Sequence, residues 1–270
     1  MPALTRRTFV AASSAALVVP IVKVKAATAM VWAIDGGLPE SYPTQDPDLV
    51  REVVGKSHVN YDRVRELVTP RPALAKAAWD WGFGDWESAL GAASHMGRHD
   101  IAELLIEHGA RANLFTFAMF GQVDVVRATC EANPGIQRLP GPHGITLMAH
   151  ARKGGDDAAA VVQYLDTLGD ADIGATNLPL DGGAMAVYMG NYEPEGAPDV
   201  VFRIAVNQRF KVVTFQRDER TARFLNYLGH DEFSPGGAAA VRISFDVENG
   251  TALGLTIRDG DLVVRADRLA

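Results

Sequence analysis

Histidine is the side chain of this sequence best suited to chemistry, because imidazole binds transition metals and exchanges protons near neutral pH. His95 and His99 are four residues apart, the spacing that places two side chains on one helical face, and His108 follows close behind. Whether His95 and His99 share a face depends on whether one helix continues through Gly97, which lies between them. A zinc site also needs three or four converging ligands, and neighbouring residues do not supply that number.

No serine or cysteine lies in a sequence motif typical of a catalytic nucleophile. No serine is followed by lysine three residues later, and no Gly-x-Ser-x-Gly sequence is present. The single cysteine, Cys130, has no intramolecular partner for a disulfide, and we expect it to be a small buried apolar residue. The sequence therefore predicts no catalytic residues and a non-enzymatic protein. An uncharacterised hydrolase, with nucleophile and base brought together from distant segments, is a further alternative.

Aromatic residues are concentrated in one short segment that suits protein binding. Trp79, Trp81, Phe83 and Trp86 lie within eight residues, with Gly82 and Gly84 between them. Aromatic side chains on a projecting loop form binding hot spots, because each offers a large apolar area with few rotatable bonds. We expect this loop to contact a protein partner. The alternative is that the four side chains fold down and seal a joint between neighbouring helices.

The segment 88–113 predicts two short helices with a turn at Gly97 and an end at Gly109. Apolar residues give each helix one buried face, at Leu90 and Ala93 in the first and at Ile101, Leu104 and Leu105 in the second. The segment resembles an ankyrin repeat, with Ser88-Ala89-Leu90 where that family has Thr-Pro-Leu. In the ankyrin layout Gly97 separates His95 from His99, so the resemblance implies that they do not share a face. We therefore predict no metal site and no cofactor.

Weaker copies of the same pattern flank this segment. Gly121 and Gly155 are placed as the turns of two later repeats, and residues 62–68 resemble the second helix of a capping repeat. The resemblance implies an ankyrin repeat domain over residues 47–174, with about three and a half repeats. It also implies a concave surface that binds another protein.

From about residue 180, apolar residues no longer recur at helical spacing but at every second position, as in a β-strand. Residues 241–247 alternate, Asn249-Gly250 forms a tight turn, and residues 253–258 and 262–265 alternate again. Earlier pieces at 186–189, 200–206, 210–215 and 223–228 bring the expected total to six to eight strands. An antiparallel β-barrel or curled sheet over residues 180–270 would hide the strand edges.

This second region also resembles a known family. Tyr188-x-Gly190-x-Tyr192, the stretch 225–233 and Val241-x-Ile243-x-Phe245 are similar to the lipocalin-like domain that follows serine β-lactamase-type hydrolases. The resemblance implies a small β-barrel appended to another module. The fold class expected for the whole chain is thus α+β multidomain, with an α-helical ankyrin solenoid followed by an antiparallel β-barrel-like domain.

Residues 1–29 resemble a twin-arginine export signal. Arg6 and Arg7 precede Phe9 and an uncharged run that is shorter than the roughly 20 residues needed to span a bilayer. Ala27 and Ala29 form the Ala-x-Ala pattern that signal peptidase cleaves. We therefore expect a periplasmic or secreted protein, exported in a folded state, with no membrane anchor after cleavage. An uncleaved amphipathic N-terminal arm is the alternative.

The net charge of the chain disfavours some classes of binding partner. Cleavage after residue 29 removes four of the 26 Lys and Arg residues and none of the 33 Asp and Glu residues, so the net charge changes from −7 to −11. Such a surface repels nucleic acid and anionic lipid. The sequence thus predicts an adaptor that binds another exported protein. A small apolar ligand held by the β-domain is the alternative.

Overall fold

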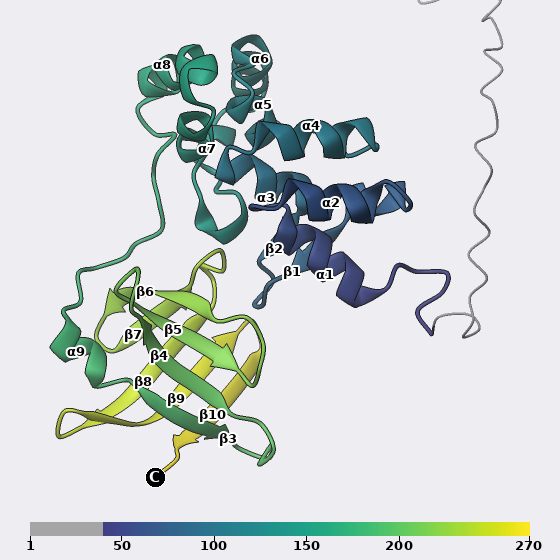
Figure 1. Ribbon diagram of the computed structural model, residues 1–270. Helices are drawn as coiled ribbons and strands as arrows, with labels where there is room; N and C mark the ends of the chain where they lie inside the picture. Colours follow the sequence, from purple (N-terminus) through teal and green to yellow (C-terminus); the bar gives the residue numbers. More distant parts are fainter. Residues whose placement is uncertain (1–39) are drawn as a thin grey trace, which may run out of the picture. The chain divides into compact units, whose positions relative to one another are not determined.

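The computed structural model describes residues 40–270. The residues of the predicted export signal, Arg6, Arg7, Phe9, Ala27 and Ala29, lie outside the described residues. Within the described part, short helices come first along the chain and a β-barrel follows (Figure 1).

Nine α-helices and four 3-10 helices are described in residues 40–270. The α-helices are α1 (Pro47–Lys56), α2 (Tyr61–Val68), α3 (Ala89–Met96), α4 (His99–Glu107), α5 (Leu114–Met119), α6 (Val123–Ala132), α7 (Leu147–Lys153), α8 (Ala159–Leu168) and α9 (Gly182–Ala186). The 3-10 helices are η1 (Pro72–Lys76), η2 (Ile136–Arg138), η3 (Pro142–Gly144) and η4 (Gly155–Ala158). Within the described residues, no helix has both the length and the apolar character that a membrane span requires.

Capping residues determine where the central helix α3 begins and ends. The Ser88 hydroxyl accepts a hydrogen bond from the Gly91 backbone N–H, which satisfies one of the free donors in the first turn. Gly97 ends the helix in the left-handed region at a φ of 68°, and a Cβ at this position would collide with the carbonyl oxygen of Lys153. These two ends keep α3 short and place His95 in its last turn.

No ankyrin-like helical solenoid is evident in residues 40–270, so the predicted fold class is wrong for the helical part. The α-helices vary from five to ten residues, and the 3-10 helices interrupt their succession. Their buried apolar side chains form two clusters, one mainly from α1–α4 and the other from α5–α8. A solenoid requires each unit to present equivalent faces to its neighbours, whereas the proline-containing turns at 70–72 and 134–142 separate the helices irregularly. The pattern of one helix pair did not determine how the pairs stack.

A two-stranded hairpin projects between η1 and α3. It consists of β1 (Ala78–Asp80) and β2 (Trp86–Ser88), which pair antiparallel with Trp79 opposite Glu87. Three residues of the connecting turn, Gly82, Phe83 and Gly84, have positive φ angles, a conformation that glycine adopts at little cost. The hairpin therefore carries the aromatic segment that the sequence analysis identified.

Eight further strands form a closed antiparallel barrel, which confirms the predicted β-barrel. The strands are β3 (Gly190–Pro194), β4 (Phe202–Asn207), β5 (Val212–Arg217), β6 (Arg223–Gly229), β7 (Glu232–Pro235), β8 (Arg242–Glu248), β9 (Thr251–Asp259) and β10 (Leu262–Arg268). Each strand pairs with its neighbours in sequence, and β10 closes the barrel against β3. Closure leaves no free edge for pairing with another chain.

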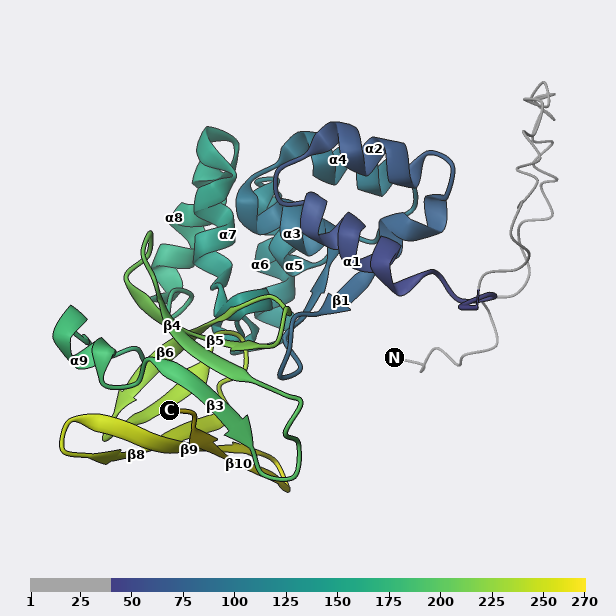
Figure 2. The same ribbon diagram turned by 60° about the horizontal axis from the view of Figure 1, so that its bottom comes forward.

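The strand predicted at residues 186–189 is wrong, because this segment contains the end of α9 and a turn. The Asp181 side chain accepts a hydrogen bond from the Ala184 N–H and starts the helix. α9 lies beside the barrel in both views, and its Met185 packs against the barrel core (Figure 1, Figure 2). The first barrel strand therefore begins only at Gly190.

Aromatic side chains make up much of the buried core of the barrel. The rings of Phe233 and Phe245 have centroids 5.5 Å apart, and both contact Tyr188 at 4.9 Å. Phe202 and Phe215 form another pair at 5.0 Å. Barrel-core residues also line two smaller cavities, one of about 320 Å³ beside Tyr227 and Phe233 and one of about 250 Å³ beside Phe202 and Phe215. Binding of a small apolar ligand by the barrel therefore stays a prediction.

Candidate metal centre

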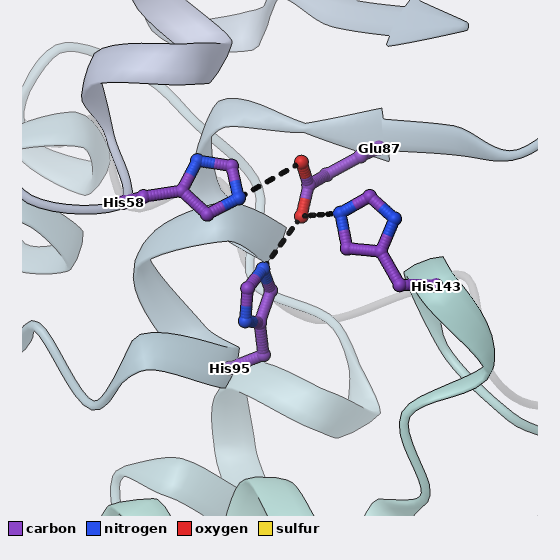
Figure 3. Close-up of side chains that lie close together, drawn as sticks. All are labelled: His58, Glu87, His95 and His143. Carbon is purple, nitrogen blue, oxygen red and sulfur yellow. Dashed lines mark hydrogen bonds and ion pairs between the residues drawn. The ribbon is translucent and has the colours of Figure 1, made fainter. Parts of the chain in front are cut away.

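Four side chains from separate segments converge beside α3. They are His58 from the turn after α1, Glu87 from β2, His95 from α3 and His143 from η3 (Figure 3). Each offers one ligand atom, and these atoms lie within 4.8 Å of one another. Imidazole and carboxylate are both common ligands of transition metals.

Glu87 is the centre of this cluster, which we call the His3Glu cluster. Its carboxylate is fully buried and accepts a hydrogen bond from the Nε2 of His95 at 2.8 Å. The Nε2 atoms of His143 and His58 lie 3.3 Å and 3.4 Å from the carboxylate oxygens. The indole N–H of Trp81 donates to the same carboxylate at 2.8 Å. Three imidazoles therefore direct the same ring nitrogen towards one buried anion.

The local sequence explains why Glu87 faces inward. Side chains alternate between the two faces of a strand, and in β2 Trp86 is exposed while Glu87 is buried. The following helix α3 begins at Ala89 and contains Ala92 and Ala93, all fully buried.

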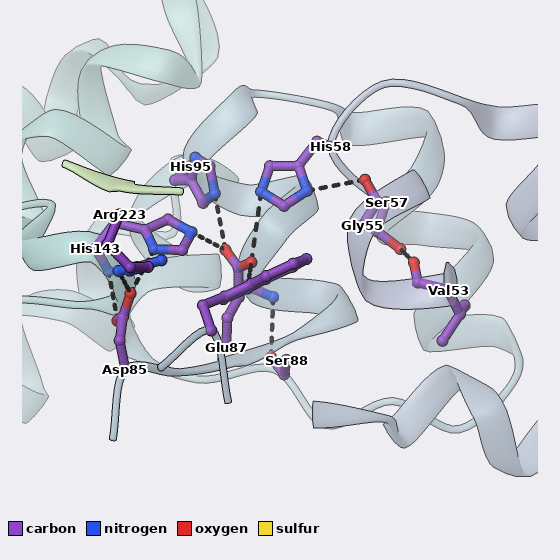
Figure 4. Close-up of polar contacts among 12 residues, drawn as sticks. Val53, Gly55, Ser57, His58, Asp85, Glu87, Ser88, His95, His143 and Arg223 are labelled. Carbon is purple, nitrogen blue, oxygen red and sulfur yellow. Dashed lines mark hydrogen bonds and ion pairs between the residues drawn. The ribbon is translucent and has the colours of Figure 1, made fainter. Parts of the chain in front are cut away.

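Two of the three histidines are oriented by a second partner. The Nδ1 of His58 lies 3.0 Å from the carbonyl oxygen of Gly55, and the Nδ1 of His143 lies 2.6 Å from a carboxylate oxygen of Asp85 (Figure 4). Because both partners are acceptors, each Nδ1 carries the proton of the contact. The Nε2 atoms of both rings are therefore the atoms directed at Glu87.

Asp85 connects this site to the barrel. Its carboxylate also accepts from the backbone N–H of His143 at 2.8 Å and pairs with the guanidinium of Arg223 at the start of β6. Arg223 donates in addition to the Gly236 carbonyl oxygen at 2.8 Å. The helical part and the barrel belong to one unit, Ser41–Ala270, and this buried ion pair joins them next to the His3Glu cluster.

The charges of the cluster follow from burial and from its hydrogen bonds. Burial alone raises the pKa of Glu87, but hydrogen bonds with His143 and His95 outweigh this effect and hold the pKa well below its usual range. Burial lowers the pKa of His143, yet contacts with Asp85 and Glu87 raise it to about 9. Burial dominates at His58 and lowers its pKa. Without metal, Glu87 is thus an anion, His143 a cation and His58 a neutral imidazole at pH 7.

A cavity of about 670 Å³ adjoins the His3Glu cluster, whose three imidazoles form part of its wall. The rest of the wall combines helical residues such as Met96 and Lys153 with barrel residues such as Phe210 and Phe224. The cluster is therefore next to a space large enough for a small molecule.

The four aromatic residues predicted to bind a partner have different surroundings. Trp79 is half-buried against the apolar cluster of α1–α4, and Trp81 donates to Glu87. The ring of Phe83 packs on the barrel residue Phe215, with centroids 5.3 Å apart. Only Trp86 among them is largely solvent-accessible, with 64% of its surface exposed. Partner binding by this segment stays a prediction, and Trp86 offers the largest accessible surface for it.

The histidines considered in the sequence analysis also have different positions. His95 belongs to the cluster, whereas the ring of His99 packs against Phe120 with centroids 5.2 Å apart. The Nδ1 of His108 lies 2.8 Å from the Leu104 carbonyl oxygen. Cys130 is buried, as expected, and burial raises the pKa of its thiol.

Sequence reasoning missed His58, Glu87 and His143, together with the supporting residues Asp85 and Arg223. Local spacing gives no sign of this cluster, because its ligands come from positions 58 to 143 and Arg223 follows 80 residues later. One local signal was available. Asp85 and Glu87 are two residues apart in an extended segment, so they share one face immediately before an apolar helix, and both would need partners if that face were buried.

In comparisons with known proteins, no family model matches this chain and no curated protein shows significant sequence similarity to it.

Proposed function

We propose that this chain binds one divalent transition-metal ion through His58, Glu87, His95 and His143. Three imidazoles and one carboxylate suit Zn²⁺ and other first-row divalent ions. The ligands of a tetrahedral ion with bonds of about 2.1 Å lie about 3.4 Å apart. The Nε2 atoms of His58 and His143 are already 3.4 Å and 3.3 Å from Glu87. These two distances involve different oxygens of Glu87, and the four ligand atoms lie within 4.8 Å of one another, so binding one ion requires the side chains to move closer together.

The observation that carries the proposal is a close approach between two acceptor atoms. His58 donates through Nδ1 to the Gly55 carbonyl oxygen, and burial lowers the pKa of the ring, so at neutral pH its Nε2 has a lone pair and no proton. This Nε2 faces a carboxylate oxygen of Glu87 at 3.4 Å. Two lone pairs repel at such a distance, whereas a metal ion between them accepts both.

Protonation of the histidines explains only part of the arrangement of side chains around Glu87. One imidazolium, His143, neutralises the charge of Glu87, and Asp85 has Arg223 as a further cationic partner. Burial lowers the pKa of His58 and opposes a second imidazolium there. Because His143 already neutralises Glu87, charge pairing does not explain why the His58 imidazole also faces this carboxylate. A role as metal ligand does explain it.

The contacts behind the ligands support the same conclusion. Metal-binding histidines commonly donate their other N–H to a carboxylate or a backbone carbonyl, which fixes the tautomer and the ring orientation. His143 makes such a contact with Asp85 and His58 makes one with Gly55. The ring nitrogens available for a metal are thus held in place before it binds.

The adjoining cavity distinguishes this centre from an enclosed structural site. Structural zinc sites with four protein ligands are normally closed, whereas an ion that faces a cavity can expand to a fifth ligand. Three of the four proposed ligands line the cavity. A bound ion would therefore be accessible to a small molecule.

The predicted export route agrees with this proposal. A chain that crosses the membrane folded is able to take up its metal beforehand, and the N-terminal sequence predicts such a route. We include periplasmic or secreted action of the metal-loaded protein in the proposal.

Metal titration tests the proposal directly. Protein stripped with a chelator is titrated with Zn²⁺ by calorimetry and with Co²⁺ by visible absorption. We expect one ion per chain and a tetrahedral cobalt spectrum. Replacing one ligand, as in His58→Ala, should weaken binding by about 100-fold or more, since losing even a supporting contact costs 10–100-fold.

His108→Ala is the matched control, because this histidine contacts a backbone carbonyl outside the cluster. It should bind metal as the wild type does. Equal loss in His58→Ala and His108→Ala, or a folded wild-type chain that binds no Zn²⁺, Co²⁺, Ni²⁺ or Mn²⁺, would overturn the proposal.

A further inference from the structure

The cavity beside the His3Glu cluster has a largely apolar wall. Met96, Ile145 and Ala149 line it from the helical part. Phe210 and Phe224 line it from the barrel, with ring centroids 5.4 Å apart. These two rings are 53% and 42% exposed, although large aromatic side chains are usually buried. Two adjacent exposed rings at the wall of a cavity offer a binding surface for an apolar group.

The polar groups of the same cavity favour an anion. Lys153 lines it and makes no ion pair with any residue in the range 40–270. The proposed metal would add positive charge at the end formed by His58, His95 and His143. The carboxylates near this end are already engaged, Glu87 with the imidazoles and Asp85 with His143 and Arg223. Among the described residues that line the cavity, Lys153 thus contributes a positive charge without an ion-pair partner, within an acidic chain.

From this arrangement we infer that the cavity binds an amphipathic organic acid. Its carboxylate takes a fifth position on the ion, beside the four protein ligands, and its apolar body lies against Phe210 and Phe224. The inference rests on the proposed metal centre, because the ion supplies the main attraction for the carboxylate. Neutral apolar molecules of the same shape gain only the contact with the aromatic rings.

The experiment uses 4-phenylbutyrate and its neutral amide, 4-phenylbutanamide, as matched probes on the full chain. Each is titrated calorimetrically into Zn²⁺-loaded protein, and the Co²⁺-loaded protein reports changes in metal coordination by absorption. We expect 4-phenylbutyrate to bind at least tenfold more tightly than the amide and to change the cobalt spectrum. Phe224→Ala should weaken 4-phenylbutyrate binding at least fivefold and leave metal affinity unchanged.

Leu253→Ala is the control for the aromatic surface, because Leu253 is similarly exposed on β9 and does not line the cavity. It should bind 4-phenylbutyrate as the wild type does. Metal-loaded protein that binds the acid no better than the amide, or a Phe224→Ala variant with unchanged affinity for the acid, overturns this inference alone. A chain that binds no metal in the preceding titration overturns the proposed function instead, so the two failures are distinguishable.

Discussion

The barrel interior holds aromatic rings in mutual contact, whereas the space beside α3 holds a carboxylate surrounded by imidazoles. In the barrel, Phe233 is fully buried among other rings. Beside α3, Glu87 is equally buried, but its neighbours are His58, His95 and His143. Burial of an apolar ring stabilises the fold directly, while burial of a charge is costly unless partners compensate for it. The comparison separates a core that stabilises the fold directly from a buried charge that needs compensating partners, and the proposed metal binding concerns only the second.

The largest effect should come from the barrel core. Phe233→Ala removes a fully buried ring, and such a change costs about 3–5 kcal/mol of unfolding free energy. Urea denaturation monitored by circular dichroism measures the loss. Metal affinity of the folded fraction should stay unchanged, and a parallel loss of metal affinity would show that the two regions do not act separately.

Glu87→Gln should instead act mainly on metal affinity. It keeps the side-chain shape but removes the charge that binds the metal, so affinity for Zn²⁺ should fall by about 100-fold, equivalent to about 2.7 kcal/mol. Competition with a chelator of known affinity measures the change. Glu66→Gln on the exposed face of α2 is the control and should retain wild-type affinity. Unchanged affinity in Glu87→Gln would remove this carboxylate from the site.

Asp85→Asn tests whether the contact that joins the two regions orients a metal ligand. The Asp85 carboxylate accepts from the Nδ1 of His143, and loss of such a supporting carboxylate lowers metal affinity by about 10–100-fold. The same chelator competition applies, with thermal melting to confirm that the variant is folded. Asp100→Asn, at an exposed pair with Arg98, is the control. Equal affinities in wild type and Asp85→Asn would show that Asp85 has only a structural role.

The pH dependence of stability should distinguish metal-free from metal-loaded protein. The pKa of His143 is raised to about 9 from its ordinary value of 6.5, so the folded state holds this proton more tightly than the unfolded state does. Its contribution, on the order of 1–2 kcal/mol after allowance for solvent screening, is complete below pH 6.5 and disappears as pH rises through 9.

Urea titrations from pH 6.5 to 9.5, with chelator or with Zn²⁺, check this dependence. Stability should fall with pH only in the presence of chelator, because the metal replaces the proton. Stability that rises with pH in chelator would contradict the assigned charge state of His143.

The smallest effect on stability is expected at Trp86. Its side chain is 64% exposed, so Trp86→Ala should change unfolding free energy by less than about 0.5 kcal/mol. The same variant tests the predicted partner contact by capture of periplasmic proteins with tagged full-length chain. A specific partner lost in Trp86→Ala would support that prediction, and capture identical to the wild type would argue against it.

Local sequence patterns were informative where the relevant contacts are local. Strict alternation at 241–247 and the Asn249-Gly250 turn predicted β8 and the hairpin to β9, because side-chain period and turn type depend on adjacent residues. The segment 186–189 was predicted as a strand, yet the cap at Asp181 makes α9 of the residues before it. The ankyrin solenoid failed for a similar reason, since it required packing between helices that no single helix pattern specifies.

The sequence by itself determined the antiparallel strands, the ends of α3 and the acidic charge of the chain. Only the tertiary structure decided which histidines meet, because His58, His95 and His143 belong to different elements and approach one another through packing alone. It also decided the state of Glu87, whose pKa depends on partners that are up to 56 residues away in the sequence. The physical reason is that packing of separate elements places one buried carboxylate where three imidazoles converge.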